Sequence, residues 1–152
     1  MSEKQFFMGI DPGANGAAAL LDTRGSLVGL IEFKKSADQE IAEFFREFST
    51  DIIHARIEKV HAMPKQGVSS TFKFGDGYGM LRGFLIAFQI PFGFVSPAEW
   101  QKIMECRTKG DKNVTKDAAY RIFPNLKITH AIADALLIAE YARRKHYSLR
   151  VD

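Results

Sequence analysis

The sequence predicts a single α/β domain with a mixed, five-stranded sheet flanked by helices. Three short apolar runs follow one another near the start of the chain with only turns between them, which is typical of an antiparallel meander. Residues 52–60 form a further apolar run that is reached through a segment with helical character, which is typical of a parallel strand, and residues 91–96 suit a fifth, edge strand. The 152 residues suit one domain, residues 1–152, and contain no repeat or linker.

The first half of the chain is expected to form three strands, a helix and a fourth strand. The three strands occupy residues 6–11, 16–21 and 27–33, joined by turns rich in Gly, Asn and Asp. A helix begins at Asp38, because apolar residues then recur every three or four positions. Since residues 52–60 follow that helix, we expect this fourth strand to pair parallel to the first strand.

The second half is expected to contain four helices and one edge strand. A long helix, capped by Ser69 or Ser70, runs to about Phe88. The remaining elements are an edge strand at residues 91–96, a short helix from Pro97, and helices at residues 114–123 and 129–145.

Several side chains of these helices are expected to be buried. In the long helix, Gly75, Gly79 and Gly83 share one face, and small residues at this spacing favour close packing. Phe72 and Phe74 are expected to be core residues, and Trp100 also fits a packing role.

Composition excludes several classes of protein. The hydrophobic fraction of 46% and the charged fraction of 26% are ordinary for a soluble globular domain. No apolar run approaches the roughly 20 residues of a membrane-spanning helix. The single cysteine, Cys106, excludes an internal disulfide and a cysteine-rich zinc site. Residues 1–4 lead straight into a strand without signal-peptide features, so we expect a cytoplasmic protein that binds no membrane.

The net charge of +3 is distributed unevenly along the chain. Residues 1–60 hold 7 Lys/Arg and 10 Asp/Glu, whereas residues 61–152 hold 14 Lys/Arg and 8 Asp/Glu. A basic second half suits a surface that meets a polyanion such as nucleic acid, although charge alone does not establish this.

Acidic residues stand at two predicted strand ends and on the last helix. Asp11 ends the first strand, where a buried carboxylate is costly unless a basic side chain or a metal ion neutralises it. Glu58 ends the parallel neighbour, so it should lie beside Asp11. His130 and Asp134 are four residues apart and share a helix face, although Asp134 could also be a plain surface carboxylate. No basic residue occupies an equally well-placed position to pair with Asp11.

These four residues form the type of ligand set that Mg²⁺ or Mn²⁺ prefers. Two such ions, roughly 3.5–4 Å apart, can activate a water molecule and stabilise the leaving oxygen in phosphodiester hydrolysis. The sequence therefore favours a metal-dependent nuclease.

Three motifs carry a resemblance to a known family. Gly-Ile-Asp-Pro-Gly at residues 9–13, Ile-Glu-Lys-Val at residues 57–60 and His-Ala-Ile-Ala-Asp-Ala-Leu at residues 130–136 resemble the signature of RuvC-type Holliday-junction resolvases. Residues 63–67 and 95–100 extend the likeness over most of the chain, and the small phage-encoded members are the most similar.

The resemblance implies a ribonuclease H-like fold and a homodimer that nicks opposed strands of a four-way DNA junction with Mg²⁺, for which Mn²⁺ is expected to substitute. It implies that Asp11, Glu58 and Asp134 are catalytic metal ligands and that His130 fills the fourth position. A phage-encoded protein would act in the host cytoplasm.

Basic residues are the candidates for DNA contacts, namely Lys65, Lys109, Lys112 and Lys116. Lys112 and Lys116 stand at or just before a helix start, where free amides also favour anions. His61 occupies the position at which some bacterial members of the family carry an aromatic residue that wedges into the junction. His61 is a candidate phosphate contact, but an ordinary loop residue is the favoured interpretation.

Three other functions share some of these sequence features. Actin-like ATPases and sugar kinases also use a Gly-Ile-Asp-Pro-Gly type of turn, but they need two such domains, and that interpretation does not explain Asp134. A ribonuclease acting on RNA–DNA hybrids would use the same acidic set. A non-catalytic nucleic-acid-binding module would not need all three carboxylates.

Overall fold

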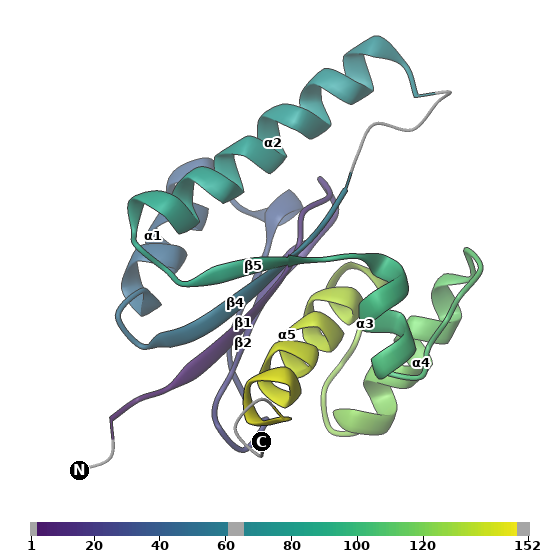
Figure 1. The fold of residues 1–152 in the computed structure, drawn as a ribbon. Coiled ribbons are helices and arrows are strands. Elements are labelled where there is room, and N and C mark those ends of the chain that lie inside the picture. Colours follow the sequence, from purple (N-terminus) through teal and green to yellow (C-terminus); the bar gives the residue numbers. More distant parts are fainter. Residues whose placement is uncertain (1–2, 61–65, 149–152) are drawn as a thin grey trace.

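The computed structural model describes residues 3–60 and 66–148, which form a five-stranded sheet with helices on both faces (Figure 1). The strands are β1 Phe6–Asp11, β2 Ala17–Leu21, β3 Leu27–Glu32, β4 Ile52–Glu58 and β5 Phe92–Val95. Their order in the sheet is β3-β2-β1-β4-β5, so β1 lies at the centre. β1, β2 and β3 pair antiparallel, whereas β4 runs parallel to both β1 and β5. The predicted mixed sheet is confirmed.

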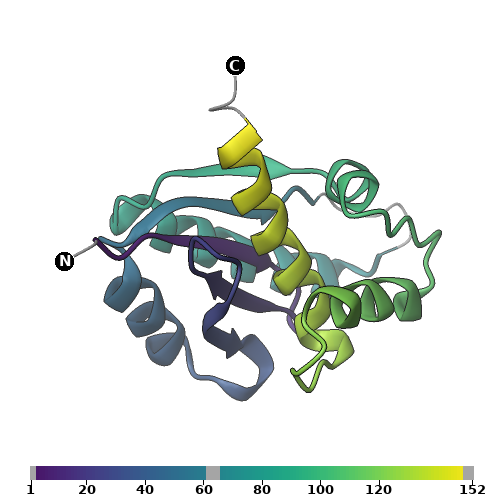
Figure 2. The same ribbon diagram turned by 90° about the horizontal axis from the view of Figure 1, so that it is seen from below.

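The helices form a layer on each face of this sheet (Figures 1 and 2). One layer contains α1 Asp38–Phe48, which follows the short 3₁₀ helix η1 Phe33–Lys35, and α2 Val68–Ala87. The opposite layer contains α3 Pro97–Ile103, α4 Lys112–Ile122 and α5 His130–Ser148. Each layer buries its own apolar cluster against the sheet, so the sheet is covered on both faces as in other α/β domains.

The close contact between α5 and the central strand depends on Gly9. A Cβ atom at this position would lie 2.1 Å from the Ala139 backbone nitrogen and 2.4 Å from the Ala135 backbone oxygen. The missing side chain therefore lets the helix backbone rest directly on β1. Because Asp134 precedes Ala135, this contact also sets the distance between Asp134 and the end of β1.

The turn after β1 folds back tightly on the strand end. The Gly16 amide donates a hydrogen bond to the Gly13 carbonyl oxygen at 2.8 Å. A Cβ atom on Gly16 would lie 2.1 Å from the Asp11 carbonyl oxygen, so only glycine fits at this point. The turn thereby forms a wall beside Asp11.

Two helix starts differ from those predicted. α2 begins after Gly67 instead of after Ser69 or Ser70. α4 begins at Lys112, two residues before the predicted start, because the Asp111 side chain caps it by accepting a hydrogen bond from the Asn113 amide at 2.9 Å. Both starts lie in polar segments without hydrophobic periodicity, where the pattern gives little guidance.

The prediction that Phe72 belongs to the core is wrong, since 75% of its surface is exposed. The predicted packing of Gly75, Gly79 and Gly83 is also not found within the described chain. A Cβ atom at each of these glycines would have nothing within 4 Å among the described residues. In the part of the chain that the structure describes, no helix has the length and hydropathy needed to cross a membrane.

Candidate active site

Asp11 and Glu58 lie at the same edge of the sheet. β1 and β4 run parallel and pair Ile10 with Ile57, which places the next residue of each strand, Asp11 and Glu58, at neighbouring carboxyl ends. Both side chains are half-buried. Their nearness follows directly from the parallel pairing, which the sequence predicted.

A polar cleft of about 480 Å³ lies next to this edge. It is bounded by the β1–β2 turn, the first turns of α4 and the first turn of α5. Its walls include Asp11, Gly13, Ala14, Asn15, Gly16, Lys112, Thr115, His130, Ala131 and Asp134. The cleft thus brings together Asp11, His130 and Asp134 of the four predicted ligands, and Glu58 is not among its walls.

The carboxylates of this region disfavour ionisation. Burial, together with repulsion from Asp134, raises the pKa of Asp11 from 3.8 to about 6. A hydrogen bond from the Gly13 backbone and the positive charge of Lys112 oppose this rise. Burial also raises the pKa of Asp134, against smaller opposite effects from Thr115, Lys112 and His130. Asp134 is therefore close enough to Asp11 to disfavour its ionised form.

Glu58 is electrostatically coupled to Asp11 and Asp134, and its side chain is also held by a hydrogen bond from α3. Burial raises its pKa from 4.5 to about 7, and repulsion from Asp11 and Asp134 adds to this rise. The Trp100 indole Nε1–H donates a hydrogen bond to Glu58 Oε2 at 2.7 Å, which favours the ionised form and lowers the pKa. Glu58 is thus fixed toward α3 while remaining coupled to the two aspartates.

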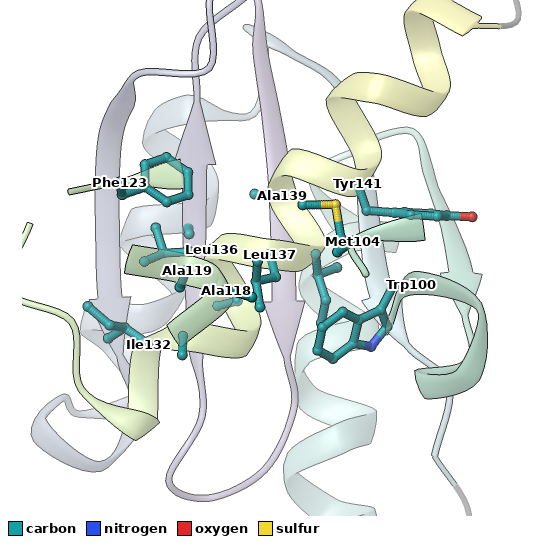
Figure 3. Packing of buried hydrophobic residues seen from close by; sticks show 14 of the residues in the cluster. Trp100, Met104, Ala118, Ala119, Phe123, Ile132, Leu136, Leu137, Ala139 and Tyr141 are labelled. Carbon is teal, nitrogen blue, oxygen red and sulfur yellow. The ribbon is translucent and has the colours of Figure 1, made fainter. Parts of the chain in front are cut away.

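Trp100 has a positioning role that its sequence context did not reveal. It is completely buried and packs in the apolar cluster under α5, close to Met104 (Figure 3). α3 is fixed in turn by Ser96, whose hydroxyl accepts a hydrogen bond from the Glu99 amide at 3.2 Å, and by Pro97 at its first position. The predicted packing role is confirmed, and the contact with Glu58 is an addition.

α4 contributes a cation and a hydroxyl group to the cleft. Lys112, the first residue of the helix, lowers the pKa of both Asp11 and Asp134 by its charge. Lys112 thus acts on Asp11 through its charge, an influence that the sequence did not predict. The buried Thr115 hydroxyl lies 3.2 Å from the Lys112 carbonyl oxygen and also reaches the Asp134 carboxylate. A hydroxyl has one hydrogen, so Thr115 can donate to only one of these acceptors at a time.

The predicted acidic ligands have the right chemistry for a hard cation but are not gathered around one point. Among residues 3–60 and 66–148, no group of three His, Cys, Asp or Glu side chains is arranged to hold a metal ion. Raised pKa values at three neighbouring carboxylates indicate a shortage of positive charge, which Lys112 alone does not offset. A divalent cation with oxygen ligands fits this donor set.

The predicted DNA-binding residues are spread around the cleft. Lys112 lines it, and Lys116, half-buried, stands one turn further along α4. Lys109 is exposed in the loop before α4, where its φ of 48° is left-handed. His61 and Lys65 lie outside the described residues.

Comparison with known proteins adds a structural likeness. No protein-family model matches the chain, and no curated protein matches it in sequence. A solved structure of Thermus thermophilus RuvC superimposes with a TM-score of 0.64, covering 97% of each chain at 14% identity. The chain has the fold of RuvC. A second structure, T. thermophilus RuvC in complex with a Holliday junction substrate, gives a TM-score of 0.58 over 96% of each chain at 14% identity. The ribonuclease H-like fold predicted from the sequence is thereby confirmed.

Proposed function

We propose that the protein is a Mg²⁺-dependent endonuclease that nicks and resolves four-way and related branched DNA junctions. The observation that carries the proposal is a set of three electrostatically coupled carboxylates: Asp11 and Glu58 at the carboxyl ends of the central parallel strands, and Asp134 on α5. The likeness to RuvC supports the choice of substrate, because one matching structure is that of RuvC with a Holliday junction.

Asp11, Glu58 and Asp134 are proposed to hold the divalent cation, with His130 as the fourth ligand. A bound pair of such ions would supply an activated water molecule and would stabilise the leaving oxygen of a phosphodiester. Mn²⁺ should replace Mg²⁺, because both ions prefer oxygen ligands. Trp100 would orient Glu58 and favour its ionised form, through the hydrogen bond that it donates to Oε2.

The residues of α4 are proposed to guide the DNA backbone into the cleft. A cleft lined by Asp11 and Asp134 repels a phosphate unless positive charge stands beside it. Lys112 supplies that charge at the start of α4, where unpaired amides also favour anions. Lys116 and Lys109 would continue the contact along the backbone, which positions DNA without reading its sequence. His61 and Lys65 remain candidates for further phosphate contacts.

We propose that the protein acts as a homodimer through the outer face of α2. This face consists of Val68, Phe72, Gly75, Gly79, Gly83 and Ile86. Its large side chains are exposed by 62–89%, and its glycines leave room for another helix to approach closely. A four-way junction presents two equivalent strands for cutting, so two copies of one active site suit it. The resemblance to phage-encoded resolvases suggests action on recombining or repaired DNA in a host cytoplasm.

The decisive experiment compares four substrates of matched sequence: a four-way junction, a Y-fork, a linear duplex and an RNA–DNA hybrid. Each is incubated with the protein in Mg²⁺, Mn²⁺ or EDTA. We expect paired nicks in the junction with either metal ion and none in EDTA. Cutting confined to the hybrid would instead identify a ribonuclease, and junction binding without metal-dependent cutting would identify a binding module.

A further inference from the structure

A second recess, of about 430 Å³, lies on the other side of the β1–β2 turn from the acidic cleft. It is formed between this turn, η1, the start of α1 and the inner face of α2. This inner face consists of Ser70, Lys73, Phe74, Gly77, Met80 and Leu81, which recur at three- and four-residue spacing. The volume lies within the range of roughly 300–1,000 Å³ that is usual for small-ligand pockets.

The recess has an apolar interior and a polar rim. Ile41 and Leu81 are buried at its base, and Phe33 and Phe74 are half-buried at its sides. Ser70, Lys73 and Asp38 are exposed and stand at its opening. A flat, apolar group would match the interior, and a negative charge attached to it would be favoured on the side of Lys73, away from Asp38.

The recess and the acidic cleft share a wall. Gly13 and Ala14 line both of them. The tight β1–β2 turn beside Asp11 therefore lies between the recess and the acidic cleft. A DNA strand whose phosphate meets the carboxylates would pass along this wall, and its neighbouring bases would face the recess.

We infer that the recess receives one unstacked base of the DNA strand that is cut in the acidic cleft. Phe74 and Phe33 provide aromatic surfaces for the base, and Lys73 meets a flanking phosphate. Bases stack on aromatic side chains with little regard to their identity, so the recess holds a base without selecting one. Branched DNA is a suitable source, because bases at a branch point are the least costly to unstack. This inference rests on the proposed endonuclease function.

Gly77 keeps the recess open. It lies on the inner face of α2, and a Cβ atom at this position would have nothing within 4 Å among the described residues. The first carbon of a side chain here would therefore meet open space, and a longer side chain would extend into the recess. All residues except proline have a higher helix propensity than glycine, so such a change should leave α2 folded.

The test combines variants of Gly77 with DNA that lacks single bases. Gly77→Leu fills the recess, and Gly77→Ala is the matched control that improves helix propensity while adding only one carbon. Thermal melting is used to check that both variants are folded. Cleavage is then measured on a four-way junction with Mg²⁺, and on junctions with an abasic nucleotide at each position flanking the cut. We expect Gly77→Leu to cut the intact junction about 10- to 100-fold more slowly, from the usual strength of base–aromatic stacking, and Gly77→Ala to cut it like the wild type.

Removal of the base that enters the recess should slow the wild-type protein by a similar factor and leave Gly77→Leu no slower than before. That loss of additivity at one nucleotide position identifies the base. Equal cutting by Gly77→Leu and the wild type would overturn the inference, as would a defect that is the same for intact and abasic DNA at every position. Failure of the wild-type protein to cut any junction would instead refute the proposed function itself.

Discussion

Replacement of Asp11 by Asn should stabilise the metal-free protein at alkaline pH. Burial and repulsion from Asp134 hold the pKa of Asp11 at about 6, compared with 3.8 for an ordinary aspartate. Between these two values the folded protein binds a proton that the unfolded chain does not, so stability falls as the pH rises from about 4 through 6. Asn keeps an oxygen that can accept the hydrogen bond from Gly13, and it carries no charge.

The size of this effect follows from the shift in pKa. A change from 3.8 to about 6 corresponds to about 3 kcal/mol of lost stability above pH 6. For a chain of this length, that energy corresponds to about 6–12 °C in melting temperature. The Asn variant also removes a charge that raises the pKa of Glu58, which adds to the stabilisation.

Melting curves in EDTA at pH 8 and pH 4.5 measure this directly. Asp11→Asn should melt about 6–12 °C above the wild type at pH 8 but only about 2–4 °C above it at pH 4.5, where about a third of the effect is present. Mg²⁺ should raise the melting temperature of the wild type at pH 8 much more than that of the variant, because a ligand stabilises only the state that binds it. Asp76→Asn, a change at an exposed position on α2, is the matched control and should alter neither result. A variant that is no more stable than the wild type at pH 8 would refute the electrostatic argument.

Three further changes test separate contacts of the site. Trp100→Phe removes the hydrogen bond that lowers the pKa of Glu58, so that pKa should rise above about 7. As the pH is lowered, Mg²⁺ binding measured by calorimetry should therefore be lost at a higher pH than in the wild type. An unchanged pH dependence would exclude this role of Trp100. Lys112→Ala combined with Lys116→Ala should weaken junction binding and reduce the slope of log affinity against log salt by about 1–2, and an unaltered slope would remove these lysines from the DNA-binding face. Gly9→Ala should lower stability by about 1–3 kcal/mol in denaturant melts, because its Cβ meets the backbone of α5; wild-type stability would show that α5 does not rest on β1 as described.

The sequence predicted those parts of the site that depend on local geometry. The nearness of Asp11 to Glu58 follows from two parallel strands that both end in a carboxylate, and the shared face of His130 and Asp134 follows from helical spacing. Both relations need only the type and direction of an element.

The contacts that the sequence did not predict join elements far apart in the chain. Trp100 and Glu58 are 42 residues apart, and their hydrogen bond depends on how α3 packs against β4. Lys112 acts on Asp11 only because α4 begins beside the β1–β2 turn. Phe72 was misplaced for another reason: apolar residues and glycines occur around the whole of α2, so its pattern does not indicate which face is buried.

Cleavage of a four-way junction by Asp11→Asn tests most directly whether the acidic cleft is the active site. Binding is measured by gel shift in EDTA, and cutting is measured with Mg²⁺ on the same DNA. We expect the variant to bind the junction at least as well as the wild type, because it removes negative charge from the cleft, and to cut it about 100-fold more slowly or worse. Cutting at the wild-type rate by Asp11→Asn would contradict the assignment of the acidic cleft as the active site.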